Sequence, residues 1–406
     1  MSPTPVTFSS PTAPTSYSWE ATNDDVAERY GVDPASIVRF DLNTSPTPPA
    51  LVAGLLAAGR FDAPLSEYPP SDYRRLTQAA AARYGVTTDE LIVGAGADEI
   101  LDLVAKAFIP AGGRAVVPTP TYSMYRVLTE QRGASVVSVP RLGAEAGWAV
   151  DVAATRIAAR DAVVVWLCSP NNPTALAEPD GGIERLLAGL AADAAGLAAD
   201  ADAARLAAEA AGADDAGTAS AAARPAPIVV LDEAYAEFVG RSLHSLREVY
   251  PNLIVVRTAS KAYALAGLRV GFAIAQPDVI ARLNVYRPPG SVSTISVTLV
   301  TEALRDPAVL EANLERVQRE RGRLSDALRA AGWSVGPSVT NFLLADLGSP
   351  TRAAAVAEGL LARGLVPRTF GAGHPLAGQL RLTVRGPDEN DRLIAAAQTL
   401  AKEDPR

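Results

Sequence analysis

The sequence predicts an α/β fold with a second, smaller α+β domain, and three stretches carry this prediction. The apolar, β-rich runs that begin residues 162–174, 226–238 and 255–272 each pass into a polar turn. Such runs are typical of central parallel strands whose carboxyl ends face a ligand. After 286 the segment RPPGSVST ends this pattern, and the remainder predicts two long helices and short strands.

Composition limits the possible functions. The 406 residues are 48% apolar, which assures a sizeable core, and the net charge of −8 without any Lys/Arg run argues against a nucleic-acid partner. The single Cys168 excludes an internal disulfide, and two histidines make a multi-histidine metal site or a hydrolase triad improbable. No basic and apolar leader and no membrane-length apolar run are present, so we expect a soluble, cytoplasmic protein without a membrane partner.

Lys261 stands at the centre of the most informative stretch. Lys106 and Lys402 are the only other lysines, so the chain carries almost all its positive charge on arginine. An amine can lose its proton when partly buried and condense with an aldehyde, which a guanidinium cannot do. Thr258 and Ser260 precede Lys261, and we expect Arg269 to follow on a related face of a helix. The alternative is a surface lysine at a strand-to-helix turn.

The segment TASKAYALAGLR, residues 258–269, resembles the cofactor-lysine motif of class I/II aminotransferases that use pyridoxal 5'-phosphate, most closely the histidinol-phosphate aminotransferases. Further matches follow in order from the early helix to Arg381. The resemblance implies fold type I: a large α/β domain with a mostly parallel, seven-stranded type of sheet, a small α+β domain built from both termini, and a homodimer.

On this basis we divide the chain into four parts. Residues 1–18 form a disordered arm, 19–45 join the small domain, 46–285 form the large cofactor-binding domain, and 286–406 form the small domain. The alanine-rich stretch at about 188–223 is predicted to be an insertion of helical fragments or disorder, remote from the chemistry.

The run LIVGAGADEILDLVAKAF predicts a strand, a glycine turn and a helix, so Gly96, Ala97 and Asp98 would present N–H groups to a phosphate. A dinucleotide fingerprint is the rival, but the full G-x-G-x-x-G is absent. The resemblance implies that Tyr122 stacks on the cofactor ring, although Tyr122 and Tyr125 could be core aromatics. It also implies that Tyr68 reaches the neighbouring subunit's cofactor phosphate, so that the active site is shared.

The strand ends supply polar side chains. The resemblance implies that Asp232 pairs with the cofactor's pyridine nitrogen, and that Asn172 and Tyr235 hydrogen-bond its phenolic oxygen. For Asp232 the alternative is a helix cap, and for Asn172 a plain loop. The family usually has glycine where Ala175 stands.

Three residues are expected to bind the substrate. Arg381 lies in an apolar strand, where a buried guanidinium needs an anion, and it matches the family's arginine for the substrate's anionic group. Arg368 matches a second anion contact, and Asn43 lies in the entrance segment. Either arginine could instead form a structural ion pair.

The predicted function is amino transfer between histidinol phosphate and 2-oxoglutarate, with Lys261, Asp232 and Tyr122 as catalytic residues and no metal. Two departures from the family, Thr44 and Pro289, weaken the substrate assignment. The alternatives are an aromatic or other amino-acid transaminase, a threonine-phosphate decarboxylase, and a non-catalytic cofactor-binding regulator.

Overall fold

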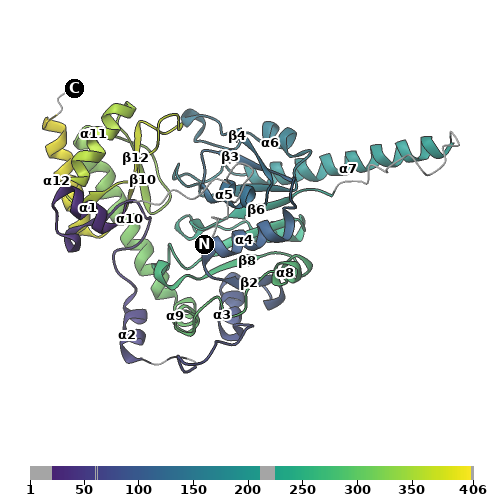
Figure 1. Cartoon of the computed structure of the whole chain (residues 1–406), viewed down its shortest axis with the longest axis horizontal. Helices are drawn as coiled ribbons and strands as arrows, with labels where there is room; N and C mark the ends of the chain where they lie inside the picture. The colour runs from purple at the N-terminus through teal and green to yellow at the C-terminus, as the bar shows by residue number, and fades with distance from the viewer. Residues whose placement is uncertain (1–20, 60, 62, 211–224, 404–406) are drawn as a thin grey trace, which may run out of the picture.

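The computed structural model describes residues 21–59, 61, 63–210 and 225–403, and its centre is a seven-stranded sheet of order β2-β8-β7-β6-β5-β3-β4 (Figure 1). Strands β4, β3, β5, β6 and β7 pair in parallel, whereas β8 is antiparallel to both β7 and β2. The predicted α/β fold with a mostly parallel sheet is thereby confirmed. The strands are β2 (Leu91–Gly94), β3 (Arg114–Thr119), β4 (Ser135–Pro140), β5 (Val164–Cys168), β6 (Ile228–Asp232), β7 (Leu253–Thr258) and β8 (Gly271–Ile274).

Helices cover both faces of this sheet, which explains why its strands are apolar without interruption. In β5, Trp166 packs in the same cluster as α4, α5 and α8, whereas its neighbours Val165 and Leu167 pack with α6 and α7 on the other face. At the β2 and β8 end of the sheet, side chains of α3 and α9 pack in one hydrophobic cluster with those of the two strands. The helices are α2 (Ala50–Ala58), α3 (Arg74–Tyr84), α4 (Gly96–Phe108), α5 (Met124–Gln131), α6 (Val152–Ala159), α7 (Gly182–Ala210), α8 (Pro277–Asn284) and α9 (Thr294–Arg305).

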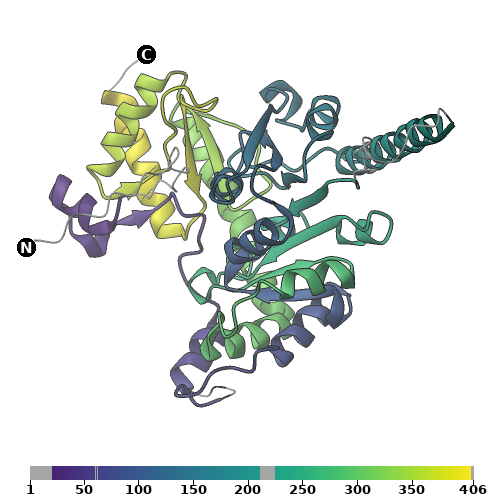
Figure 2. The ribbon, with the colours of Figure 1, turned by 45° about the vertical axis from the view of Figure 1, so that its right-hand side comes forward.

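A second core joins the two ends of the described chain. Strand β1 (Val38–Arg39) pairs in parallel with β11 (Leu365–Val366), and β9 (Ser334–Val335), β10 (Phe342–Asp346) and β12 (Gln379–Thr383) form a three-stranded antiparallel sheet. Phe40 packs in this core with side chains from the C-terminal helices. Figure 2 shows the N-terminal segment beside the C-terminal one. The helices here are α1 (Asn23–Tyr30), α10 (Pro307–Ala330), α11 (Pro350–Leu361) and α12 (Pro387–Glu403).

The C-terminal part differs from the sequence prediction in its helices. Four described helices, not two, follow residue 286, and Val300 of α9 packs with Phe272 of β8 in the core of the large sheet. We therefore propose that the small domain begins within α10 rather than at 286. The other predicted boundaries stay predictions. The predicted arm, residues 1–18, lies outside the described residues, which begin at residue 21.

The alanine-rich stretch also differs from the prediction. Its described part belongs to one 29-residue helix, α7, not to fragments, and Figure 1 shows this helix extending away from the body. Alanine has the highest helix propensity, and the bidentate pair between Arg156 and Asp193 (2.8 and 3.0 Å) anchors the helix base to α6. Residues 211–223 of the predicted insertion lie outside the described residues.

The segment after Lys261 is not the predicted helix. It forms turns and a three-residue 3₁₀ helix (Ala266–Leu268), after which Arg269 adopts a left-handed backbone (φ 49°) and β8 begins. The chain therefore reverses within a few residues, and this reversal brings Arg269 back to Lys261. No helix of the described residues has the length and apolar character to cross a membrane.

Candidate active site

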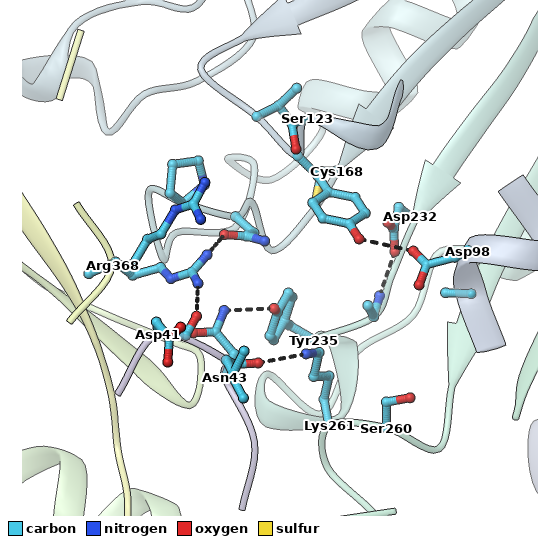
Figure 3. Close-up of a pocket in the computed structure, with 18 of the residues that line it drawn as sticks. Asp41, Asn43, Asp98, Ser123, Cys168, Asp232, Tyr235, Ser260, Lys261 and Arg368 are labelled. Atoms are coloured by element: carbon cyan, nitrogen blue, oxygen red, sulfur yellow. Dashed lines mark hydrogen bonds between the residues drawn. The ribbon is translucent and has the colours of Figure 1, made fainter. Parts of the chain in front are cut away.

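A pocket of about 340 Å³ lies where the carboxyl ends of β5, β6 and β7 meet the second core (Figure 3). Cys168 and Asp232 are register partners at the ends of β5 and β6, and Thr258 ends β7 beside them. Adjacent parallel strands end at the same edge of a sheet, so side chains far apart in sequence converge there. In Figure 3, Arg368 enters from the C-terminal segment, opposite Asp98 and Asp232.

Lys261 extends its Nζ into this pocket. The amine donates to the Leu42 carbonyl oxygen (3.3 Å) and lies 5.9 Å from the centroid of the Tyr235 ring. Burial and the nearby Arg381 guanidinium lower the pKa of Lys261 to about 8, against the opposing effect of Asp98. A substantial fraction of the amine is therefore unprotonated at mildly basic pH, and an unprotonated amine is a nucleophile and a base.

Asp232 is fixed by two hydrogen bonds and is only 4% exposed. Its Oδ2 accepts from the Tyr125 hydroxyl (2.7 Å), and its Oδ1 accepts from the Ala234 N–H (3.0 Å). Burial raises the pKa of Asp232 to about 6, while these two hydrogen bonds oppose the rise. The Ala234 contact closes a local turn, but Asp232 caps no helix, because the following 3₁₀ helix (Ala236–Phe238) has Tyr235 as its N-cap residue. The same carboxyl group lines the pocket.

The first turn of α4 offers backbone N–H groups at one end of the pocket. Helix α4 begins at Gly96, so the N–H groups of Gly96, Ala97 and Asp98 have no intrahelical acceptor. Gly271 allows this turn to sit against β8, because a Cβ at Gly271 would lie 2.4 Å from the Gly96 carbonyl carbon. Free backbone N–H groups at a helix N-terminus have the geometry and partial positive charge that suit an anion.

Arg269 and the Asp98 side chain border this turn. Arg269 donates from Nη2 to Asp98 Oδ2 (3.0 Å), and the Tyr122 hydroxyl donates to Asp98 Oδ1 (2.9 Å). A Cβ at Gly96 would lie 2.4 Å from Arg269 Nη2, so the glycine makes room for the guanidinium. Beside them, the Ser260 N–H donates to Thr258 Oγ1 (3.1 Å), which orients both hydroxyl-bearing residues at the turn before Lys261.

Asn43 and Tyr235 form the opposite wall. The Asn43 Nδ2 donates to the Tyr235 hydroxyl oxygen (2.9 Å), and Asn43 takes a left-handed backbone (φ 54°) held by Thr383 and Asn341. Asn172 accepts from Arg381 Nη1 (2.6 Å) on the same side. Ala175 also has a left-handed backbone (φ 66°), a conformation that a glycine would adopt without strain.

The second core contributes the remaining cations. Arg381 also donates from Nη2 to the Asp41 carbonyl oxygen and lies over the Phe342 ring. Its backbone pairs with that of Arg368, which aligns the two arginines along one edge of the pocket. Both interact with backbone or side-chain partners and still line the pocket.

Two predicted residues do not line the pocket. Gly96 lies behind Arg269, as described above, and Tyr68 is 94% exposed and outside it. Sequence reasoning missed Asp41, Cys168, Phe370 and His374 as lining residues, and Tyr125 as the partner of Asp232. Tyr122 precedes α5 (Met124–Gln131), so helical spacing does not relate it to Tyr125, and no local pattern indicated that the Tyr125 hydroxyl meets Asp232. Burial raises the pKa of Cys168 to about 12, so it stays a thiol.

The family of aminotransferases of class I and II has a model that matches residues 40–196 and 219–397. The chain belongs to this family. It is 33% identical over 380 residues to the histidinol-phosphate aminotransferase of Symbiobacterium thermophilum, and this alignment covers 92% of each chain. It is 35% identical over 345 residues to the histidinol-phosphate aminotransferase of Xanthomonas campestris, and this alignment covers 83% of this chain and 85% of the relative. The unmatched residues 197–218 fall inside the predicted insertion.

Solved structures agree on the fold of this aminotransferase. The histidinol-phosphate aminotransferase of Sinorhizobium meliloti, solved in complex with pyridoxal-5'-phosphate, superposes with a TM-score of 0.77 at 24% identity and covers 96% of each chain. The aspartate aminotransferase of Thermus thermophilus with maleate gives 0.69 at 22% identity, covering 95% of this chain and 97% of that one. The protein is a pyridoxal-phosphate-dependent aminotransferase of fold type I.

The pocket of this aminotransferase fits pyridoxal phosphate. The close approach of Gly271 to the first turn of α4 leaves free amides for a phosphate, with Arg269 and two hydroxyl groups beside them. Asp232 offers a buried carboxylate for a protonated ring nitrogen, and Lys261 offers an amine for an aldehyde carbon. The donor set therefore fits the phosphate, the ring nitrogen and the aldehyde carbon of the cofactor.

Proposed function

We propose that this aminotransferase moves the amino group of histidinol phosphate to 2-oxoglutarate. The observation that carries the proposal is the pairing of Arg368 and Arg381 along the pocket edge that faces Lys261, since both substrates carry anionic groups. The two relatives with 33% and 35% identity, both named histidinol-phosphate aminotransferases, support the same donor. The two residues that depart from the family pattern, Thr44 and Pro289, do not line the pocket. The Thr44 carbonyl oxygen accepts from Arg385 Nη1 (3.4 Å), which does not line the pocket either.

The proposed roles follow from position and charge. When bound, pyridoxal phosphate supplies an aldehyde for the substrate amine and a ring that accepts electrons from the substrate carbon. The amides of Ala97 and Asp98, the hydroxyls of Thr258 and Ser260, and Arg269 would bind its phosphate. Tyr122 would cover one ring face.

Lys261 would hold the cofactor's aldehyde carbon through Nζ. Once the substrate amine has displaced it, the Lys261 Nζ would take the α-proton of the substrate and release it to the carbon that had carried the aldehyde, on the other side of the transferred nitrogen. Its lowered pKa suits both transfers, because the amine can exist in either form near neutral pH. Asp232 would keep a proton on the ring nitrogen opposite its carboxylate.

Tyr235 would donate its hydroxyl proton to the ring's phenolic oxygen. Asn43 donates to the Tyr235 oxygen, so the hydroxyl proton is left to point elsewhere, and the pocket is the open direction. Asn172 would donate to the same oxygen. Arg381 would bind a carboxylate of the acceptor, and Arg368 would bind the phosphate of the donor.

The decisive experiment records the visible absorption of the purified holoenzyme before and after adding histidinol phosphate without a keto acid. We expect loss of the visible band and one equivalent of the ketone product per site, and recovery of the band on adding 2-oxoglutarate. An unchanged band would exclude this donor. Release of carbon dioxide from threonine phosphate would support the decarboxylase alternative. Loss of the visible band on adding aromatic amino acids would support the related transaminase.

The proposal includes a homodimer with a shared site. Tyr68 is exposed, and its ring lies 3.7 Å from a Cβ position built at Gly290. The apolar side chains of Leu65, Val285 and Tyr286, close to these two residues in sequence, are also exposed. A second copy of the chain would cover these side chains and receive Tyr68 at its phosphate site. Sedimentation should give twice the chain mass of 42.1 kDa.

Mixing inactive variants tests the shared site directly. A dimer of one Lys261→Ala chain and one Tyr68→Ala chain should hold one intact site, so mixing after subunit exchange should restore activity that neither variant has. No recovery in proven mixed dimers would contradict the role of Tyr68. We also propose a cytoplasmic location, because both substrates are soluble metabolites, and cell fractionation would test it.

A further inference from the structure

Tyr125 does not line the active-site pocket, but it is the side-chain donor to Asp232, which does. Its side chain is fully buried in α5, and its hydroxyl donates to Asp232 Oδ2 at 2.7 Å. The Ala234 N–H donates to the other carboxylate oxygen. A carboxylate held at both oxygens has a fixed plane, so its remaining lone pairs keep one direction.

The Tyr125 ring is itself locked by a closed, buried network. It stacks on Trp166 with centroids 5.4 Å apart and planes 7° from parallel. The Trp166 Nε1 donates to Thr129 Oγ1 (3.1 Å), and Thr129 donates back to the Tyr125 carbonyl oxygen (2.7 Å). The position of the hydroxyl is therefore set by packing, before any contact with Asp232.

The charges around Asp232 make this one hydrogen bond important. Tyr125, Cys168 and Asp98 face it from α5, β5 and α4, and Lys261 faces it from the turn after β7. Burial and Asp98 both favour the neutral carboxyl group, whereas the Tyr125 hydroxyl, Ala234 and Lys261 favour the anion. A phenol has a single proton to donate, and here it stabilises the charged form in a site of low dielectric.

We propose that Tyr125 is a positioning residue that keeps Asp232 ionised and directed at the ring nitrogen of the cofactor. The proposal rests on the proposed role of Asp232 and adds the residue that makes that role possible. Tyr125 acts through Asp232 and needs no contact with cofactor or substrate.

The test compares Tyr125→Phe with a matched control. Phenylalanine keeps the ring and its stacking on Trp166 and removes only the hydroxyl. Losing a hydrogen bond to a charged group should lower kcat about 10- to 100-fold and shift the acid limb of the pH profile up by about one unit. Tyr84→Phe removes a hydroxyl that is also buried, without a hydrogen-bond partner among the described residues, and should leave both quantities unchanged.

A double-mutant cycle separates an effect through Asp232 from a general loss of packing. Cofactor dissociation is measured by equilibrium dialysis of the holoenzymes of wild type, Tyr125→Phe, Asp232→Asn and the double variant. If Tyr125 acts through the Asp232 charge, Tyr125→Phe should weaken cofactor binding about tenfold or more in the wild type and less than about twofold in the Asp232→Asn background.

Equal losses in both backgrounds, or a Tyr125→Phe pH profile identical to that of Tyr84→Phe, would overturn the proposal. If Asp232→Asn itself leaves cofactor binding and activity intact, the proposed role of Asp232 fails, which is a different result from additivity in the cycle.

Should Tyr125→Phe unfold, the cycle is repeated with Thr129→Ser and Thr129→Val. Only the valine variant loses the hydroxyl that holds the Tyr125 carbonyl and should reproduce the acid-limb shift. An unshifted profile there would also overturn the proposal.

Discussion

The amide nitrogen of Asn43 donates to the hydroxyl oxygen of Tyr235 at 2.9 Å, across 192 positions of sequence. This bond joins the N-terminal segment of the second core to the end of the large sheet. Because it occupies a lone pair on the Tyr235 oxygen, it leaves the hydroxyl proton for the pocket. We predict that Asn43→Ala lowers kcat/KM about 10-fold with the cofactor retained, measured by steady-state kinetics.

The control for Asn43 is Asn43→Gly, which also removes the amide but relieves the left-handed backbone (φ 54°). Both variants should lose activity equally if the side-chain hydrogen bond matters. Recovery in the glycine variant alone would show that backbone strain, not the hydrogen bond, caused the loss.

Replacing Lys261 with alanine should abolish turnover and leave part of the cofactor bound, because the phosphate site does not depend on Nζ. The measurement combines activity with the bound cofactor per chain after gel filtration. Lys106→Ala, which removes a surface pair with Asp102 (2.6 Å), is the matched control and should keep full activity. Near-normal turnover in Lys261→Ala would refute the assignment.

The folded-state pKa of Asp232, raised from 3.8 to about 6, predicts a pH dependence of stability. Between these two values the folded protein binds more protons at this group than the unfolded chain, so the free energy of unfolding falls as pH rises through the window. The full effect is on the order of 3 kcal/mol for about two pKa units. In the cofactor-free protein, Asp232→Asn should remove this contribution.

Denaturant unfolding at several pH values from 4 to 7 checks this pH dependence. The free energies of unfolding of the wild type and Asp232→Asn are compared at each pH, so that the contributions of other titrating groups cancel. The difference between the two proteins should change across the window and stay level above it. A difference that does not vary with pH would contradict the raised pKa.

Gly271→Ala should destabilise the protein and weaken cofactor binding. The added Cβ would lie 2.4 Å from the Gly96 carbonyl carbon and 2.5 Å from the Ala97 nitrogen, so the first turn of α4 must move away from β8. Overpacking of this kind costs about 1–3 kcal/mol. Gly267→Ala, where nothing lies within 4 Å of the new Cβ, is the control and should change neither thermal stability nor cofactor affinity.

Arg368→Ala should raise KM for the phosphorylated donor more than for 2-oxoglutarate, because one charge-assisted contact is lost. We expect about a 10- to 100-fold loss of kcat/KM for the donor. Arg160→Ala, a substitution outside the pocket lining, is the control. Equal effects of Arg368→Ala on both substrates would assign the arginine a structural role.

The sequence by itself determined the strand ends and the chemistry placed there. Asp232 was found because an apolar run followed by a polar residue marks the carboxyl end of a buried parallel strand, and such ends meet at one edge of a sheet. Lys261 was found because the chain has only two other lysines and because the residues around it resemble a known cofactor-lysine motif. Local patterns also located the glycine turn before α4, since a helix start and its free N–H groups depend on neighbouring residues only.

Only the tertiary structure decided the contacts that cross between the two cores. Arg381 reaches Asn172 over 209 positions, and Tyr125 rather than another aromatic residue meets Asp232. Arg269 arrives through a chain reversal, not along a helix. The described part of the alanine-rich stretch belongs to one helix, α7, whose base packs Leu186 and Leu190 against the large sheet. Periodicity specifies which face of an element is buried, but the partner across that face depends on how distant elements pack, which no local pattern encodes.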